Sequence, residues 1–365
     1  MTTIADIVNH LNQIAPPALQ ESYDNAGLLV GNGQAQVTNI LITLDITEAV
    51  IDEAKSKGCE LIVAHHPIIF KGLKRLTGSN YVERTVIKAI KEDIALYACH
   101  TNLDNVKHGV NAKIAEKIGL TNLRILSPKK QQLGKLSVFV PSSDADSVKQ
   151  SLFAAGAGQI GAYNDCAFES SGTGSFTPAE NANPKIGKTG TPEKVSEIKI
   201  EVVFPFYLKN SILSAMMASH PYEEVAYYAH LLENDNNEIG AGMIGELPTE
   251  LDEKTFMDHL KSKMNLSTLK HTALLNKKVK KVAVCGGSGS FLIKDAINAK
   301  ADFYVSADIK YHEYFDADQA LVIADIGHYE SEIFTNELFY AVLTEKFANI
   351  ALHLGQTVTN PIKYY

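Results

Sequence analysis

The chain has 365 residues, 45% of them hydrophobic and 21% charged, with a formal net charge of −8. This length allows two or three domains with well-buried cores. The acidic balance argues against broad electrostatic binding to nucleic acid or to an anionic membrane surface. The four cysteines are scattered without a C-x-x-C pair. That pattern predicts reduced thiols in a cytoplasmic protein, and neither a disulfide framework nor a thiolate zinc site.

The first half of the chain predicts an α/β fold. Residues 4–14 carry apolar side chains at helical spacing, without the basic start and apolar run of a signal peptide, and no stretch is long and apolar enough to span a membrane. Strand-like and helix-like segments then alternate, with strands at 39–47, 61–67 and 94–104 and helices at 48–60 and 85–93. Such alternation predicts a parallel sheet with helices on both faces.

The C-terminal part repeats the same plan. Strand, helix, strand and strand-to-helix patterns follow one another at 280–290, 291–301, 302–313 and 319–332. We interpret this repetition as a degenerate internal duplication of one α/β/α unit. The alternative is a repetitive strand–helix architecture without duplication.

The middle of the chain has a different pattern. Expected strands and helices follow in the order β-α-β-β-α-β, at 134–141, 144–157, 158–171, 196–205, 208–220 and 223–232. This order is the ferredoxin-like split motif. We therefore expect an inserted α+β domain at 130–240, between the two halves of an outer domain at 1–129 and 241–365.

Two adjacent histidines stand where a buried strand ends. His65 and His66 close the apolar run LIVAHHP, and ligands of open α/β sheets bind at the carboxyl ends of the strands. Pro67 favours extended backbone at His66, so the two imidazoles diverge and can serve two different metal ions. Taken alone, such a pair is more often an ordinary core or surface feature.

Other potential metal ligands also stand at or just after the expected carboxyl ends of strands. Asp104 comes just after the strand expected at 94–104, whereas an isolated aspartate there would usually be a turn residue. His328 and Glu332 are spaced i, i+4 on an expected helix and so share one face, although a plain surface contact is common at that spacing. With the histidine pair they form a set of three imidazoles and two carboxylates, which is typical of two-metal hydrolytic sites. Zinc, iron, manganese and nickel all suit such a set.

Three further segments are weaker candidates. Lys310 and His312 stand at a matching strand end and are candidate catalytic groups that supply acid, base or anion contact, with a solvated lysine and a packed histidine as the alternative. The glycine turn at 286–290 is either a phosphate cradle or a tight turn. His220, in HPYEE, either reaches toward the metal cleft or stops a helix before a strand.

Several of these motifs together resemble the Nif3-like family, whose members are also called GTP cyclohydrolase 1 type 2 homologs. The matching segments are ESYDNAGLLVG, LIVAHHPIIF, HTNLD, IGELP, SADIKYHE and GHYESE, and HPYEE is similar to the longer bacterial members with a PII/CutA1-like insert. The resemblance implies two divalent metal ions per chain, in a dinuclear centre held by His65, His66, Asp104, His328 and Glu332. It also implies a toroidal homohexamer with the metal clefts facing an internal cavity.

Two functions remain in competition at this point. The first is a metal-dependent hydrolase in which Glu332 bridges the ions and the substrate is a nucleotide such as GTP, although no guanine-reading motif is visible. The second is a non-catalytic metal-handling or regulatory scaffold whose insert senses a small molecule. A turnover assay separates them.

Overall fold

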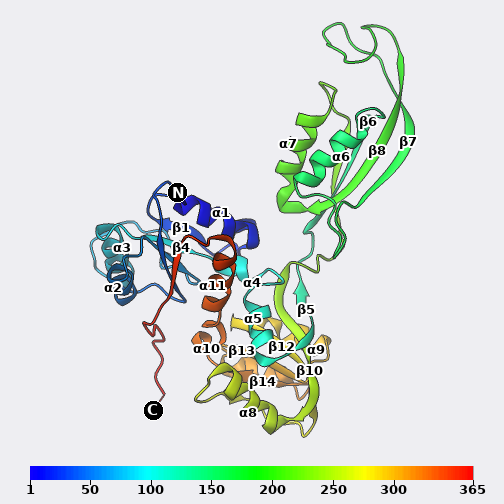
Figure 1. Ribbon diagram of the computed structural model, residues 1–365. Helices are drawn as coiled ribbons and strands as arrows, with labels where there is room; N and C mark the ends of the chain where they lie inside the picture. Colours follow the sequence, from blue (N-terminus) through cyan, green and yellow to red (C-terminus); the bar gives the residue numbers. More distant parts are fainter. Residues whose placement is uncertain (365) are drawn as a thin grey trace. The chain divides into compact units, whose positions relative to one another are not determined.

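A computed structural model describes residues 1–364. The chain divides into two compact units, both drawn in Figure 1. Unit 1 consists of Met1–Ser127 and Ile239–Tyr365, and unit 2 of Pro128–Glu238. Within residues 1–364, no helix is both long enough and apolar enough to cross a membrane.

The first sheet of unit 1 has five strands in the order β1-β4-β3-β2-β15. Strands β2, β3, β4 and β15 are parallel, while β1 is antiparallel to β4. Every residue of β3 and β4 is buried, which explains their continuous apolar sequences. The strands are β1 (Gly27–Val30), β2 (Asn39–Thr43), β3 (Leu61–Ala64), β4 (Ala95–Ala98) and β15 (Ala351–Leu354), with helices α1 (Ile4–Ile14), α2 (Glu48–Ser56) and α3 (Tyr81–Lys91).

The second sheet of unit 1 has six strands in the order β11-β14-β13-β12-β10-β5. Strands β12, β13 and β14 are parallel, and β11 is antiparallel to β14. The arrangement β11-β14-β13-β12 therefore matches β1-β4-β3-β2 in order and direction. The strands are β5 (Thr121–Pro128), β10 (Gly240–Asp252), β11 (Lys270–His271), β12 (Lys278–Ser288), β13 (Phe303–Ala307) and β14 (Val322–Asp325).

One hydrophobic core contains residues of both sheets. Ile42 and Val63 of the first sheet belong to the same buried cluster as Val284 and Val305 of the second. This shared core fixes the carboxyl ends of β3, β4 and β14 relative to one another. The remaining helices are α4 (Thr101–Asp104), α5 (Val110–Ile118), α8 (Glu253–Met264), α9 (Ile293–Asn298), α10 (His328–Glu332) and α11 (Thr335–Lys346), with short 3₁₀ helices η1 (Pro17–Leu19), η3 (Ser290–Leu292) and η4 (Tyr311–Ala317).

The strand expected at 302–313 is shorter than its sequence pattern indicates. It ends at Ala307, and η4 follows from Tyr311. Asp308 has a φ of 55°, in the left-handed region, which an extended strand does not accommodate. The polar residues of SADIKYHE therefore do not continue the strand.

Unit 2 contains one antiparallel sheet in the order β7-β8-β6-β9. Its elements follow in the sequence order β-α-β-β-α-β, and both helices pack on the same buried cluster as Leu136, Val138 and Ile200. The elements are β6 (Leu133–Pro141), α6 (Ala145–Ala154), β7 (Ala167–Phe176), β8 (Glu193–Pro205), η2 (Phe206–Leu208), α7 (Lys209–Ser219) and β9 (Tyr227–Leu231). Residues 177–192 connect β7 to β8.

Candidate metal centre

The five candidate ligands lie at the ends of three strands of unit 1. His65 and His66 follow β3 directly, and Asp104 is the last residue of the short helix after β4. His328 and Glu332 are the first and last residues of α10, which follows β14. Their ligand atoms form two overlapping groups within 4.8 Å, one of His66, His328 and Glu332 and one of His65, Asp104 and Glu332. The structure thus brings the five residues together.

Glu332 belongs to both groups, and its two oxygens face different partners. Oε2 lies 2.9 Å from Nε2 of His66 and 3.0 Å from Nε2 of His328. Oε1 lies 3.8 Å from Nε2 of His65. The side chain is 3% exposed. A carboxylate in this position can be shared by two ions.

Two buried polar atoms of the cluster have no hydrogen-bond partner among residues 1–364: Nε2 of His65 and Oδ1 of Asp104. They lie 3.6 Å apart. Nδ1 of His65 donates to the carbonyl oxygen of Cys99 at 2.9 Å, so Nε2 carries a free lone pair. Buried polar atoms are rarely left unsatisfied in folded proteins. A divalent cation between an imidazole nitrogen and a carboxylate oxygen would satisfy both, so the residues fit a metal ion.

Two further carboxylates orient the other histidines. Oδ1 of Asp45 accepts from Nδ1 of His66 at 2.7 Å, and Oδ2 of Asp308 accepts from Nδ1 of His328 at 2.7 Å. Each imidazole therefore presents Nε2 to the cluster, as carboxylate–histidine pairs do in metal sites. The sequence analysis missed both aspartates. The same strand-end rule could have found them, because Asp45 follows β2 and Asp308 follows β13.

The two adjacent histidines have opposite electrostatic environments. Burial lowers the pKa of His65 to about 4, since its neighbouring groups do not compensate for desolvation of the imidazolium. Burial also disfavours the charged form of His66, but hydrogen bonds to Asp45 and Glu332 outweigh it and raise the pKa of His66 to about 10. His65 is therefore a neutral ligand at neutral pH without any help from a metal.

The two carboxylates of the cluster also differ. Burial, followed by the charge of Glu332, raises the pKa of Asp104 well above its usual range. Burial opposes ionisation of Glu332 as well, but its contacts with the three histidines outweigh it and hold the pKa of Glu332 well below its usual range. The pKa of His328 rises to about 9 because contacts with Glu332 and Asp308 exceed the cost of burial. A bound cation would stabilise the charged form of Asp104 and so lower its pKa.

The glycine turn at 286–290 packs against this cluster. Gly287 has a φ of +60°, and a Cβ on it would stand 2.5 Å from Oε1 of Glu332. The amide of Gly287 donates to Oγ of Ser331 at 3.0 Å, and that of Gly286 donates to Oδ1 of Asn111 at 2.9 Å. Because these two amides already donate to side chains of the protein, they are not available to a phosphate. The geometry therefore favours the tight turn over the phosphate cradle.

His100 lies beside the histidine pair. Its ring centroid is 5.2 Å from that of His65 and 5.3 Å from that of His66. Its Nδ1 donates to Oδ1 of Asp24 at 2.7 Å. Burial works against the Asp24 carboxylate, but hydrogen bonds from His100 and Thr101 outweigh it and lower the pKa of Asp24 to about 2. Asp24 thus orients the ring of His100, and a ring nitrogen of His100 lies within 4.8 Å of ring nitrogens of His65 and His66.

Lys310 and His312 lie apart from the five residues. Both are exposed. The ion pair of Lys310 is with Glu313, at 4.0 Å, and the ring of His312 lies 5.2 Å from Tyr311. Within residues 1–364, no hydrogen bond or ion pair connects either of them to the cluster. His220 belongs to unit 2, where it stops α7.

Comparison with known proteins gives consistent results over nearly the full chain. A family model described as Duf34/NIF3 (NGG1p interacting factor 3) matches residues 2–361. A Bacillus subtilis protein named GTP cyclohydrolase 1 type 2 homolog is 39% identical over 98% of this chain and 97% of its own length. A Staphylococcus aureus protein of the same name is 35% identical over 99% of both chains.

Solved structures agree with these matches. The crystal structure of a Bacillus cereus protein related to NIF3 superposes with a TM-score of 0.87 at 37% identity, over 100% of this chain and 99% of that one. A Staphylococcus aureus protein superposes with a TM-score of 0.80 at 31% identity, with the same coverage. The mixed α/β fold with several sheets is the fold of these structures. The chain belongs to the Duf34/NIF3 family.

Proposed function

We propose that unit 1 is a metal-dependent hydrolase with a dinuclear centre that acts on a nucleotide such as GTP. The observation that carries the proposal is the pair of unsatisfied buried atoms on His65 and Asp104, beside a Glu332 carboxylate that faces both halves of the cluster. The set of three imidazoles and two carboxylates suits zinc, iron, manganese or nickel.

The residues divide into two ligand groups that share one carboxylate. His66 and His328 would hold one ion and His65 and Asp104 the other, with Glu332 as the bridge. Bound divalent ions would supply a nucleophile by lowering the pKa of a water molecule to about 7. Asp45 and Asp308 hold His66 and His328 in the tautomers that present Nε2 to the ions. His100 lies close enough to His65 and His66 to hold or move a proton beside them.

The identity of the substrate rests on names rather than geometry. The curated relatives are named GTP cyclohydrolase 1 type 2 homolog, which supports a guanine nucleotide as the first compound to test. We also propose that unit 2 is a PII/CutA1-like ferredoxin-like insert, because its sheet order and element order suit that topology. The repeated strand order in unit 1 supports an origin by duplication. We further propose that the protein is a homohexamer in the cytoplasm.

Formate release from GTP by the metal-loaded full chain tests the proposal, alongside other nucleotides and phosphoesters. Turnover that is present in wild type and absent in Glu332→Gln supports it. If Glu332→Gln is as active as wild type, the bridging role is wrong. If wild type turns over no compound of the panel, the metal-handling or regulatory scaffold becomes the better function. The cavity in unit 2 is the observation that favours this second candidate.

A further inference from the structure

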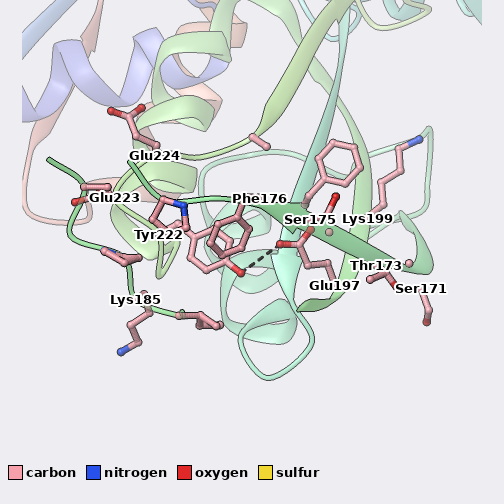
Figure 2. A pocket seen from close by; sticks show the side chains of 18 of the residues that line it. Ser171, Thr173, Ser175, Phe176, Lys185, Glu197, Lys199, Tyr222, Glu223 and Glu224 are labelled. Atoms are coloured by element: carbon pink, nitrogen blue, oxygen red, sulfur yellow. Dashed lines mark hydrogen bonds between the residues drawn. The ribbon is translucent and has the colours of Figure 1, made fainter. Parts of the chain in front are cut away.

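Unit 2 contains a cavity of about 620 Å³. It lies against β7 and β8, and residues of the 177–192 connection and of the segment after α7 complete its wall. Figure 2 shows the side chains around it. The volume is in the range of small-molecule sites in proteins, roughly 300–1,000 Å³. All of these residues belong to unit 2, and none of the five candidate metal ligands is among them.

A nearly buried carboxylate lines this cavity. Glu197 of β8 is 9% exposed. Its one described hydrogen bond comes from the hydroxyl of Tyr222, which lies 3.3 Å from Oε1 and is directed toward it in Figure 2. Among residues 1–364, no lysine, arginine or histidine forms an ion pair with it. A carboxylate offers about four acceptor positions, so most of the accepting capacity of Glu197 is unused.

A second glutamate on the same strand provides a direct comparison. Glu201 is four residues further along β8, on the same side of the sheet, but it lies 2.7 Å from Nζ of Lys199 and 2.9 Å from Nζ of Lys135. Both lysines are therefore paired with Glu201. Lys199 also lines the cavity, but among residues 1–364 it forms no ion pair with Glu197. A largely buried carboxylate without a cation is unfavourable in an apolar environment.

The neighbouring strand leaves room for this carboxylate. A Cβ on Gly174 of β7 would stand 2.2 Å from Oε2 of Glu197. Any larger residue at position 174 would therefore push the carboxylate out of its place. The absence of a side chain at Gly174 thus leaves space for the carboxylate of Glu197 at the wall of the cavity.

Three aromatic rings form much of the remaining wall. Phe139, Phe176 and Tyr222 line the cavity, and the rings of Phe176 and Tyr222 meet edge to face at 6.0 Å. His220 holds two of the three in place. Its Nε2 donates to the carbonyl oxygen of Phe139 at 2.9 Å, and its Nδ1 accepts from the amide of Tyr222 at 3.1 Å. The HPYEE motif therefore builds this wall.

We propose that this cavity binds an organic cation, namely an amine with an apolar or aromatic body. The ammonium group donates to Glu197, and the body lies among Phe139, Phe176 and Tyr222. Both features favour a positive charge, since a cation neutralises the buried carboxylate and is attracted to aromatic faces. Glu223, Glu224 and Lys185 line the cavity with exposed side chains, and the fourth charged neighbour of Glu197 there, Lys199, is paired with Glu201. An anionic ligand of the same shape is disfavoured.

Calorimetric titration of the full chain tests this inference with three matched probes. Phenethylamine, phenethyl alcohol and phenylpropionate share a benzene ring and differ in charge. We expect the amine to bind at least about tenfold more tightly than the other two. Tyramine and spermidine extend the amine series.

Glu197→Gln and Glu169→Gln are the matched variants. The first keeps the shape of the acid in the cavity and removes its charge, so amine affinity should fall at least about tenfold. The second removes an acid of the neighbouring strand β7 that is paired with Lys149 outside the cavity, and it should leave amine affinity within about twofold of wild type. The inference is overturned if Glu197→Gln binds phenethylamine as wild type does. It is also overturned if none of the amines binds at about 10 mM, or if phenylpropionate binds best.

Discussion

Nε2 of His65 lies 3.6 Å from Oδ1 of Asp104, and neither atom has a hydrogen-bond partner among residues 1–364. The two residues come from different strand ends, 39 positions apart in the sequence (104 − 65). Nδ1 of His65 is already fixed by the carbonyl of Cys99. The pair therefore leaves room for a third partner, and an imidazole nitrogen beside a carboxylate oxygen suits a metal ion.

Asp104→Asn should remove one of the two ions. The amide keeps the shape of the side chain but lacks the anionic oxygen that faces His65, whereas His66, His328 and Glu332 are left intact. We expect metal content to fall from about two ions per chain to about one. Elemental analysis of protein that has been reloaded and dialysed measures this directly.

Glu332→Gln and His312→Ala complete this experiment. Glu332→Gln should lose both ions, because its carboxylate belongs to both ligand groups. His312→Ala should keep both, because His312 is exposed and apart from the cluster. Full metal content in Glu332→Gln would contradict the shared carboxylate. If His312 is nevertheless the proton donor, the variant keeps its metals and loses turnover.

The sequence indicated the five clustered residues better than the groups that orient them. His65, His66 and Asp104 follow buried apolar strands, and the carboxyl ends of parallel strands meet at one edge, so their convergence could be expected. Asp45 and Asp308 obey the same rule, but an aspartate after a strand is usually a turn residue. The hydrogen bond from His65 to the carbonyl oxygen of Cys99 could not be predicted, because a contact with the backbone does not depend on which side chain the residue carries.

The limits of the fold prediction have similar causes. Apolar runs indicated β2, β3 and β4 well, but strand direction is set by pairing partners, so antiparallel β1 and β11 were not expected. The left-handed Asp308 ends β13 early; aspartate is disfavoured in strands and tolerates positive φ, but the apolar Ile309 after it kept the pattern strand-like. Local pattern thus predicts which residues are buried more reliably than where an element ends.

Gly287→Ala should weaken metal binding without unfolding the protein. Its Cβ would stand 2.5 Å from Oε1 of Glu332, so the carboxylate must move away from the position where it faces His65. We expect metal affinity to fall by about tenfold or more. Competition with a chelator of known affinity measures the change.

Gly58→Ala is the control for backbone strain. Gly58 has a φ of +64°, close to that of Gly287, but a Cβ there meets nothing within 4 Å. Both variants should lose roughly 1–2 kcal/mol of stability from left-handed backbone. Only Gly287→Ala should lose metal. Equal metal affinity in the two variants would show that Glu332 can relax without cost.

Removal of unit 2 should leave a folded unit 1. Strands β5 and β10, which lead into and out of unit 2, are neighbours in the second sheet. Cβ of Leu126 lies within 3.3 Å of a Cβ placed on Gly242, so a short turn can join the two strands. We expect the shortened chain to unfold cooperatively on heating and to bind both metal ions. An unfolded product with every linker tried would show that unit 1 depends on unit 2 for folding.

Glu53 should make the C-terminal segment sensitive to acid. Its carboxylate accepts from the amides of Gln356 and Thr357 at 2.8 and 2.9 Å and from Nζ of Lys57 at 2.6 Å. Burial opposes ionisation, but these hydrogen bonds outweigh it and lower the pKa of Glu53 from 4.5 to about 2. Because the folded-state pKa is the lower one, the unfolded chain takes up a proton first as pH falls.

The stabilisation from Glu53 is therefore complete above about pH 4.5 and is lost as pH falls toward about 2. At neutral pH, Glu53→Gln should lower the free energy of unfolding by roughly 1–2 kcal/mol. This difference from wild type should shrink as pH falls through that window, which urea unfolding at a series of pH values measures. Glu48→Gln, on the same helix, removes an exposed ion pair with Arg84 and should change stability by less than about 0.5 kcal/mol at any pH. If the deficit of Glu53→Gln is the same at about pH 3 as at neutral pH, the carboxylate does not hold the C-terminal segment through its charge.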